Sequence, residues 1–140
     1  MEMRLKYNTS ETSISNIQIN NKNIYLYNQK KMQRFCLALD LMDDPQLIAE
    51  YERYHERIPE AIDKSIRDSG IANLEIYRIG SRLFMILEAN DDFTFEKKGR
   101  MDADNPDVQA WETLMWKFQK PLKEAKEGEK WIFMNRIFQL

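Results

Sequence analysis

The chain contains few of the residues that usually indicate covalent or metal-based chemistry. It has one cysteine, one histidine, four glycines and four prolines among 140 residues. Cys36 alone excludes an intrachain disulfide and a cysteine-based metal cluster, and it is typical of a protein from a reducing cytoplasm. The glycines lie too far apart to form a phosphate-binding loop, and dinucleotide and serine-hydrolase motifs are missing. We therefore do not expect nucleotide-driven chemistry.

Long apolar runs and an excess of one charge are also missing. No apolar stretch approaches the ~20 residues that cross a membrane, and the first 30 residues are polar rather than built like a signal peptide. With 21 basic and 23 acidic residues, the net charge is -2, and there is no basic stripe of the kind that binds nucleic acid. We expect a cytoplasmic protein that binds neither nucleic acid nor a membrane.

The residues that are present predict one compact domain. Hydrophobic residues make up 43% of the chain and aromatic residues 11%, which is more than disordered chains usually carry. Residues 1–30 are rich in Asn, Ser and Thr, and we expect a polar N-terminal extension there, either a hairpin or an arm without fixed structure. The domain proper should cover residues 31–140.

The expected secondary structure alternates between apolar strands and helices that begin at a proline. An N-cap residue followed by proline marks each helix start, at Asp44–Pro45 and at Asn105–Pro106. Pro59 should interrupt the first helical segment, which then continues to about Ser69. A polar loop is expected over residues 90–105. The predicted strands cover residues 34–42, 71–79, 82–89 and 131–140.

The order of these elements predicts the fold class. Strand, helix, strand, strand, helix, strand is the order of a ferredoxin-like α+β unit, in which both helices cover one face of a four-stranded antiparallel sheet. The strands are apolar on both sides, so the uncovered face should pack on another surface, most simply the sheet of a second copy. We therefore predict a homodimer.

His55 is the candidate for proton-transfer chemistry. It lies four residues after Tyr51, so both side chains share one helix face. The ordinary pKa of a histidine side chain is about 6.5, so it can accept or donate a proton at physiological pH. The alternative is a structural histidine beside the helix break, with Tyr51 as ordinary core. One histidine without further ligands does not predict a metal site.

The tryptophans offer a second kind of site, because aromatic rings stack on the apolar face of a sugar. Trp111 shares the apolar stripe of the second helix and is expected to pack in the core. Trp116 is off that stripe and needs another partner, either a pocket or a second subunit.

Several segments together resemble the L-rhamnose mutarotase family, in detail its L-fucose mutarotase branch. They are LALDLM, AEYERYH, PEAIDKSIRDSGIANLEIYRI, RLFMILE, MWKFQ and GEKWIFMNRIF, in order over residues 32–140. The resemblance implies a dimeric ferredoxin-like α/β barrel that interconverts the α and β anomers of a 6-deoxy sugar. It also implies that neither a cofactor nor a metal is used.

The resemblance further implies roles for individual residues. His55 matches the family's proton donor, which would act on the ring oxygen, and Tyr51 matches a tyrosine that contacts the sugar. The base is open, with Glu88 or a bound water as candidates. A paired-tryptophan motif reads Met115 and Trp116 here, and a family tyrosine falls on Leu74. The expected substrate contacts are Trp116, Met115, Asn73, Tyr77 and Trp131, and the departures from the family pattern favour L-fucose over L-rhamnose.

Two other functions fit the same architecture, because a fold does not determine a function. One is a cofactor-independent oxygenase or haem-handling enzyme, in which the histidine would be a proximal haem ligand. The other is a ligand sensor or dimerisation module in which His55 is structural. Absorbance in the haem bands and the rate of anomer exchange distinguish these two functions from each other and from a mutarotase.

Overall fold

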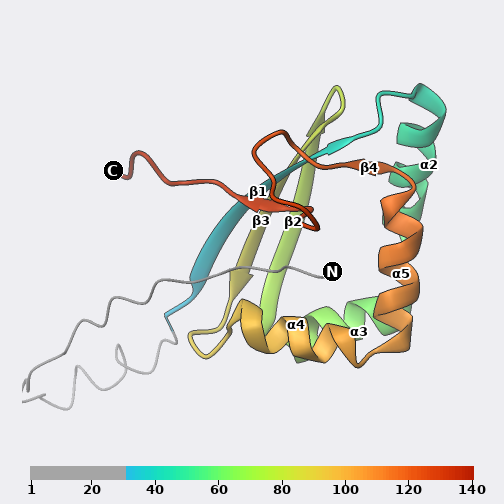
Figure 1. Ribbon diagram of the computed structural model, residues 1–140. Helices are drawn as coiled ribbons and strands as arrows, with labels where there is room; N and C mark the ends of the chain where they lie inside the picture. Colours follow the sequence, from blue (N-terminus) through green and yellow to red (C-terminus); the bar gives the residue numbers. More distant parts are fainter. Residues whose placement is uncertain (1–30) are drawn as a thin grey trace, which may run out of the picture.

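The computed structural model describes residues 31–140, so the expected N-terminal extension lies outside the described residues. These residues form one antiparallel sheet with the order β2-β3-β1-β4, and β5 also pairs with β1. The ferredoxin-like α+β prediction is confirmed (Figure 1). The strands are β1 (Gln33–Leu41), β2 (Ile71–Ile79), β3 (Arg82–Ala89), β4 (Gln119–Lys120) and β5 (Ile132–Phe133). The helices are α2 (Pro45–Glu56), α3 (Glu60–Asp68), α4 (Phe95–Ala103) and α5 (Pro106–Trp116).

The predicted helix starts are confirmed at both N-caps. The Asp44 carboxylate accepts hydrogen bonds from the backbone N–H groups of Gln46 and Leu47, at 2.8 and 3.2 Å. Asn105 caps α5 in the same way. Each cap satisfies donors that have no partner inside the helix, and the proline that follows has a backbone φ already suited to the first turn.

The helical segment breaks at Pro59, as expected. Helix α2 ends at Glu56, and its C-cap residue Arg57 has extended backbone angles. Proline disfavours the helical conformation of the residue before it, so the chain runs extended until α3 begins at Glu60. As a result, His55 lies in the last turn of α2, beside the gap between the two helices.

The core lies between one face of the sheet and the helices. Leu37, Leu39 and Leu41 of β1 are almost fully buried, together with Met85 and Leu87 of β3. The alternate residues of each strand point to the other face, because side chains alternate along a strand. The apolar strand β1 is therefore covered by helices on one side only.

The polar loop predicted for residues 90–105 is wrong, since most of it forms α4. Thr94 caps this helix by accepting from the N–H of Lys97 at 3.2 Å, and Phe95 packs its ring against Phe35. The inward face of α4 carries an ion pair, Lys98 with Asp102 at 2.9 Å, and both residues are 1% exposed. Because charged residues occupy positions where a helix normally shows apolar ones, the hydrophobic period gave no signal.

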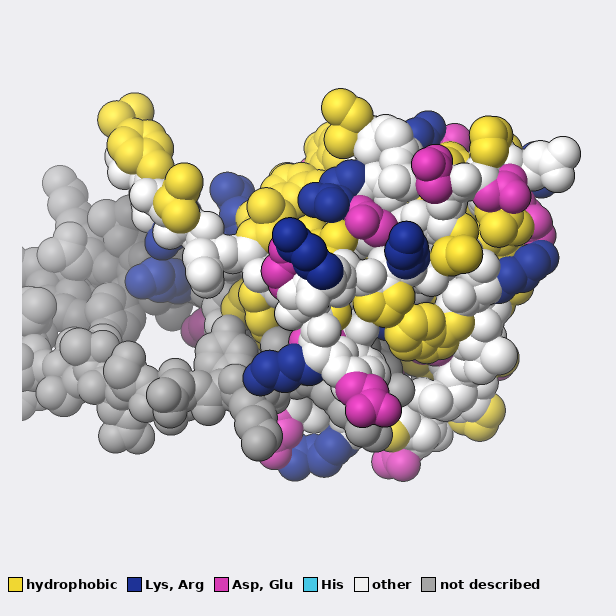
Figure 2. Space-filling model, turned by 45° about the horizontal axis from the view of Figure 1, so that its top comes forward, with side chains coloured by type: hydrophobic (Ala, Val, Ile, Leu, Met, Phe, Trp, Pro, Cys, Tyr) yellow, Lys and Arg dark blue, Asp and Glu magenta, His cyan; other side chains and the backbone are white. Residues whose placement is uncertain are grey.

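The last predicted strand, residues 131–140, is much shorter than expected. Only Ile132–Phe133 pairs with β1, next to the short strand β4, which was not predicted. Beyond Met134 the chain leaves the domain as an extended tail (Figure 1). Ile137 and Phe138 of this tail are 97% and 75% exposed. Figure 2 shows the tail projecting from the body of the molecule, with hydrophobic side chains at its end.

The face of the sheet opposite the helices has an apolar centre between charged ends. The strand registers place Cys36, Ala38, Phe84 and Ile86 in neighbouring positions on it. Ion pairs lie at its two ends, Arg34 with Glu88 and Arg82 with Asp40. The four helices of the described residues lie on the other side of the sheet (Figure 1). We refer to this surface as the open sheet face.

No helix within residues 31–140 is both long enough and apolar enough to cross a membrane. Charged side chains of both signs are spread over the surface seen in Figure 2.

Candidate active site

Tyr51 and His55 lie against each other in the last turns of α2. Their ring centroids are 4.2 Å apart, and Nδ1 of His55 is 2.8 Å from the backbone carbonyl oxygen of Tyr51. A carbonyl only accepts, so Nδ1 carries the hydrogen and donates it. In neutral imidazole the other nitrogen, Nε2, then has a lone pair. This geometry makes Nε2 of His55 the atom that can take a proton from a ligand.

The surroundings of the two rings determine their protonation. Burial lowers the pKa of His55, and the hydrogen bond to the Tyr51 carbonyl only partly opposes this. The imidazole is therefore neutral at neutral pH. Burial is the main cause that raises the pKa of Tyr51 to about 12. A hydrogen bond from the Gln119 side chain lowers this pKa, and the negative charge of Glu112 raises it further. The phenol of Tyr51 consequently keeps its proton.

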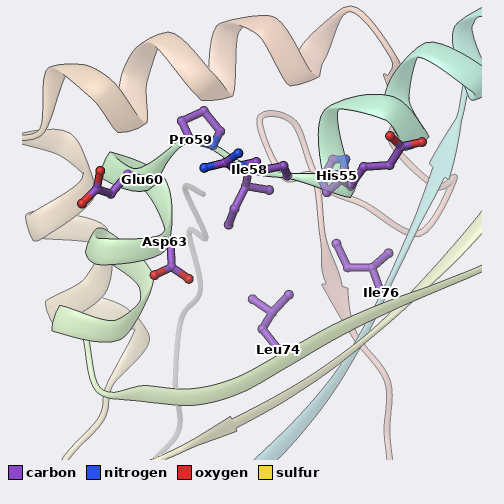
Figure 3. A pocket seen from close by; sticks show the side chains of 9 residues that line it. His55, Ile58, Pro59, Glu60, Asp63, Leu74 and Ile76 are labelled. Carbon is purple, nitrogen blue, oxygen red and sulfur yellow. The ribbon is translucent and has the colours of Figure 1, made fainter.

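His55 lines two neighbouring hollows, which also share Ile58, Leu74 and Ile76 in their walls. The outer one is a cleft of about 820 Å³ between the end of α2, the start of α3 and strand β2. Figure 3 shows His55 at one side of this cleft, Asp63 and Glu60 on α3, and Leu74 and Ile76 on β2. Its size is within the range of small-ligand sites. The inner hollow is a cavity of about 90 Å³ beneath His55, which has room for part of a ligand.

The inner cavity has mostly apolar walls with a few polar groups. Tyr51, His55, Glu112 and Gln119 supply the polar atoms. Glu112, on α5, accepts a hydrogen bond of 2.6 Å from the ammonium group of Lys130, and both residues are buried. Burial alone would raise the pKa of Glu112, but the positive charge of Lys130 and its hydrogen bond act in the opposite direction. The carboxylate is therefore ionised inside the cavity wall.

The tryptophans and Met115 divide between the cavity and the surface. Met115 and Trp131 line the inner cavity, where we expected substrate contacts. Trp116 is 43% exposed and lies outside the cavity walls, with the Lys130 ammonium 4.6 Å from its ring centroid. Trp111 was expected only to pack in the core, yet it lines the cavity with its ring centroid 5.6 Å from that of His55.

Three residues expected at the site face away from it. Leu74 and Ile76 of β2 border the cavity, so Asn73 and Tyr77 point to the open sheet face. There the Tyr77 hydroxyl donates to Glu75 at 2.8 Å, and Asn73 lies beside the same carboxylate. Glu88, a candidate base, is on this face too, paired with Arg34. Within one chain, these side chains are not brought together with His55.

Two polar residues of the cavity were missed by the sequence analysis. Glu112 lies between Val108 and Met115 on the buried face of α5, so an acidic residue within an apolar stripe was the available signal. Gln119 gave no signal, because its position depends on the pairing of β4 with Leu41 of β1. Among residues 31–140, no group of three His, Cys, Asp or Glu side chains is arranged to hold a metal ion.

Comparison with known proteins gives a consistent assignment. The family model for L-rhamnose mutarotase matches residues 34–140. An L-fucose mutarotase from Xanthomonas campestris pv. campestris is 49% identical over 112 residues, which cover 78% of this chain and 89% of that protein. A UPF0734 protein from Dictyostelium discoideum is 33% identical over 113 residues, 76% of this chain and 88% of that one.

A solved structure shows the same fold. The L-rhamnose mutarotase from Formosa agariphila superposes with a TM-score of 0.58 at 15% identity, over 77% of this chain and 98% of that chain. The family match over residues 34–140 includes Tyr51, His55 and the residues that line both hollows. The chain belongs to the L-rhamnose mutarotase family.

Proposed function

We propose that this protein is a mutarotase that interconverts the α and β anomers of a 6-deoxy-L-hexopyranose, with L-fucose preferred and L-rhamnose next. Membership of the family supports the reaction, and the 49% identity to an L-fucose mutarotase supports the sugar. The observation that carries the proposal is the position of His55 in the walls of both hollows, with its Nδ1 hydrogen-bonded to the Tyr51 carbonyl. Such a residue can move protons on a bound sugar.

Ring opening needs two proton transfers, one at each of the two oxygens bonded to C1 of the sugar. Nε2 of His55 takes the proton of the anomeric hydroxyl, the C1 carbonyl forms, and the bond from C1 to the ring oxygen breaks with its electron pair on that oxygen. The ring oxygen is then protonated, either by the imidazolium just formed or by the Tyr51 phenol. Because both oxygens are bonded to C1, one imidazole can reach each in turn. His55 thus acts as acceptor first and then as the acid.

Closure on the other face completes the reaction. The open-chain aldehyde rotates about its C1–C2 bond, and the same steps in reverse form the other anomer. This rotation needs room near His55, which the outer cleft of about 820 Å³ supplies. Acid–base help of this kind accelerates a reaction by roughly 10²–10⁴-fold, which suffices for a ring opening that already occurs in water.

The apolar wall of the inner cavity supports a 6-deoxy sugar. Ile62, Ile66, Leu74 and Met85 border this cavity. A methyl group at C6 can enter it without losing hydrogen bonds, whereas a C6 hydroxyl would lose its contacts with water. L-Galactose, which differs from L-fucose only by that hydroxyl, should have a kcat/KM lower by about 10–100-fold.

NMR exchange spectroscopy on the anomeric protons tests the proposal. Catalytic amounts of the protein are added to L-fucose, L-rhamnose and L-galactose, and the α to β exchange rate is compared with that of each sugar alone. We expect the largest acceleration for L-fucose and the smallest for L-galactose. Exchange rates equal to those without protein for all three sugars would refute the mutarotase assignment.

We further propose that the protein is a homodimer that packs two open sheet faces together, in the cytoplasm. Phe84 and Ile86 at the centre of that face are half-buried although no helix of residues 31–140 covers them. Acidic and basic side chains lie at both ends of the face, so a two-fold arrangement can bring opposite charges together. Asn73 and Tyr77 would then lie at the interface.

Analytical ultracentrifugation tests this assembly against the chain mass of 16.8 kDa. Phe84→Glu places a charge at the centre of the proposed interface and should shift the protein to monomers. Gln46→Glu adds the same charge on the exposed start of α2 and serves as the control. A wild-type protein that sediments as a monomer, or a Phe84→Glu variant as dimeric as the control, would contradict the proposal.

A further inference from the structure

The side chain of Gln119 lines the inner cavity with a polar atom that has no hydrogen-bond partner. Gln119 is 6% exposed, and its Oε1 is buried without a hydrogen-bond partner. It is the only such side-chain atom within the described residues. An acceptor left in this way costs about 1–3 kcal/mol relative to one that is bonded, so an apolar residue of similar shape would be favoured for stability alone.

The backbone around Gln119 holds the amide in a defined place. Its strand, β4, pairs with Leu41 of β1, and the preceding carbonyl of Phe118 accepts from the N–H of Met42 at 2.7 Å. Side chains of paired residues share a face, so Gln119 points to the same side of the sheet as Leu41, into the core. The amide therefore cannot turn outward to reach bulk water.

The other end of the amide is already in use at the site. The Gln119 side chain hydrogen-bonds the phenol of Tyr51, whose ring lies 4.2 Å from that of His55. Gln119 thus has its nitrogen directed to Tyr51, while Oε1 remains as an acceptor among the walls of the cavity. A ligand that satisfies Oε1 must carry a hydrogen-bond donor, and the hydroxyl groups of a sugar are such donors.

We propose that Gln119 is a substrate-binding residue whose Oε1 accepts a hydrogen bond from one ring hydroxyl of the sugar. This inference rests on the proposed mutarotase function and adds a polar contact to it. The amide binds the sugar on one side and Tyr51 on the other, so it fixes the ring relative to His55. A site built to accept a hydroxyl discriminates against a sugar that lacks it, because the acceptor then stays unpaired.

The test compares the wild type with Gln119→Met, which keeps the length of the side chain and removes the acceptor. Sugar affinity is measured by saturation-transfer NMR and by the rise in Tm with sugar concentration. For L-fucose we expect the Kd of the variant to be about 10-fold higher, because the variant lacks one hydrogen bond between the sugar and a buried acceptor. Gln33→Met is the matched control, since it removes an amide that donates to the carbonyls of Asn90 and Phe93 at the other end of β1. It should change Tm but leave the Kd unaltered.

Deoxy sugars identify the hydroxyl that is bound. Affinities of the wild type and Gln119→Met are compared for the 2-, 3- and 4-deoxy derivatives of L-fucose, which forms a double-mutant cycle. We expect the two proteins to differ for all but one derivative, and that derivative lacks the hydroxyl bound by Gln119. An unchanged Kd for L-fucose in Gln119→Met, with exchange still accelerated by the wild type, would overturn this inference alone. A wild type that neither binds L-fucose nor accelerates its exchange would overturn the proposed function with it.

Discussion

Replacement of His55 by Asn is the sharpest perturbation of the proposed reaction. Asn keeps an N–H that can donate to the Tyr51 carbonyl, as Nδ1 does over 2.8 Å, but it cannot accept a proton at neutral pH. The anomer exchange rate should therefore fall by roughly 10²–10⁴-fold, the usual contribution of a general acid or base. Loss of some packing against Tyr51 and Trp111 should cost about 1 kcal/mol, or ~4 °C in Tm.

The pH dependence of the wild type gives an independent check. The pKa of His55 is lowered, chiefly by burial, so the neutral imidazole persists below the ordinary value of about 6.5. The accelerated rate should thus be constant through neutral pH and fall only below about 6.5, as the imidazole becomes protonated before it meets the sugar. In the Asn variant, the remaining rate should lose this acidic decline.

The measurement is exchange spectroscopy of L-fucose from pH 4.5 to 9, with the rate of the sugar alone subtracted at each pH. Circular dichroism of both proteins over the same range separates loss of chemistry from loss of structure. Exchange by His55→Asn at the wild-type rate would refute the assignment of His55. A wild-type decline centred well above the ordinary histidine pKa would refute the argument from burial.

Three further substitutions examine the polar groups around His55. Tyr51→Phe should reduce the exchange rate about 10-fold or less, and by the same factor at every pH from 7 to 9, because the pKa of about 12 keeps the wild-type phenol protonated over this range. A loss as large as that of His55→Asn would show that Tyr51 is essential. Lys130→Met should lower the free energy of unfolding in urea by about 1–3 kcal/mol, because it removes the ammonium that donates to the buried Glu112 carboxylate, and Glu112→Gln in the same chain should restore part of it. Equal stabilities of Lys130→Met and the wild type would contradict this account.

Local chemistry made much of the fold readable from the sequence. The helix starts at Asp44–Pro45 and Asn105–Pro106 and the break at Pro59 each depend on a few adjacent residues. Helix α4 was missed because its buried Lys98 and Asp102 neutralise each other only after the helix has packed. In the sequence, these two charged residues cannot be distinguished from charged residues that are exposed to solvent.

The order of the first three strands and of the two helices that begin at a proline, the neighbouring placement of Tyr51 and His55, and the family resemblance can all be read from the sequence. These follow from spacing along one helix and from matching segments, which need no knowledge of distant contacts. The other residues that reach the site are set by contacts between distant parts of the chain. Strand alternation turned Asn73, Tyr77 and Glu88 to the open sheet face, and packing of α5 and β4 on the core brought Glu112 and Gln119 beneath His55. A one-residue change in strand register reverses the side on which a residue lies, so such placements depend on the pairing of distant strands rather than on residue type.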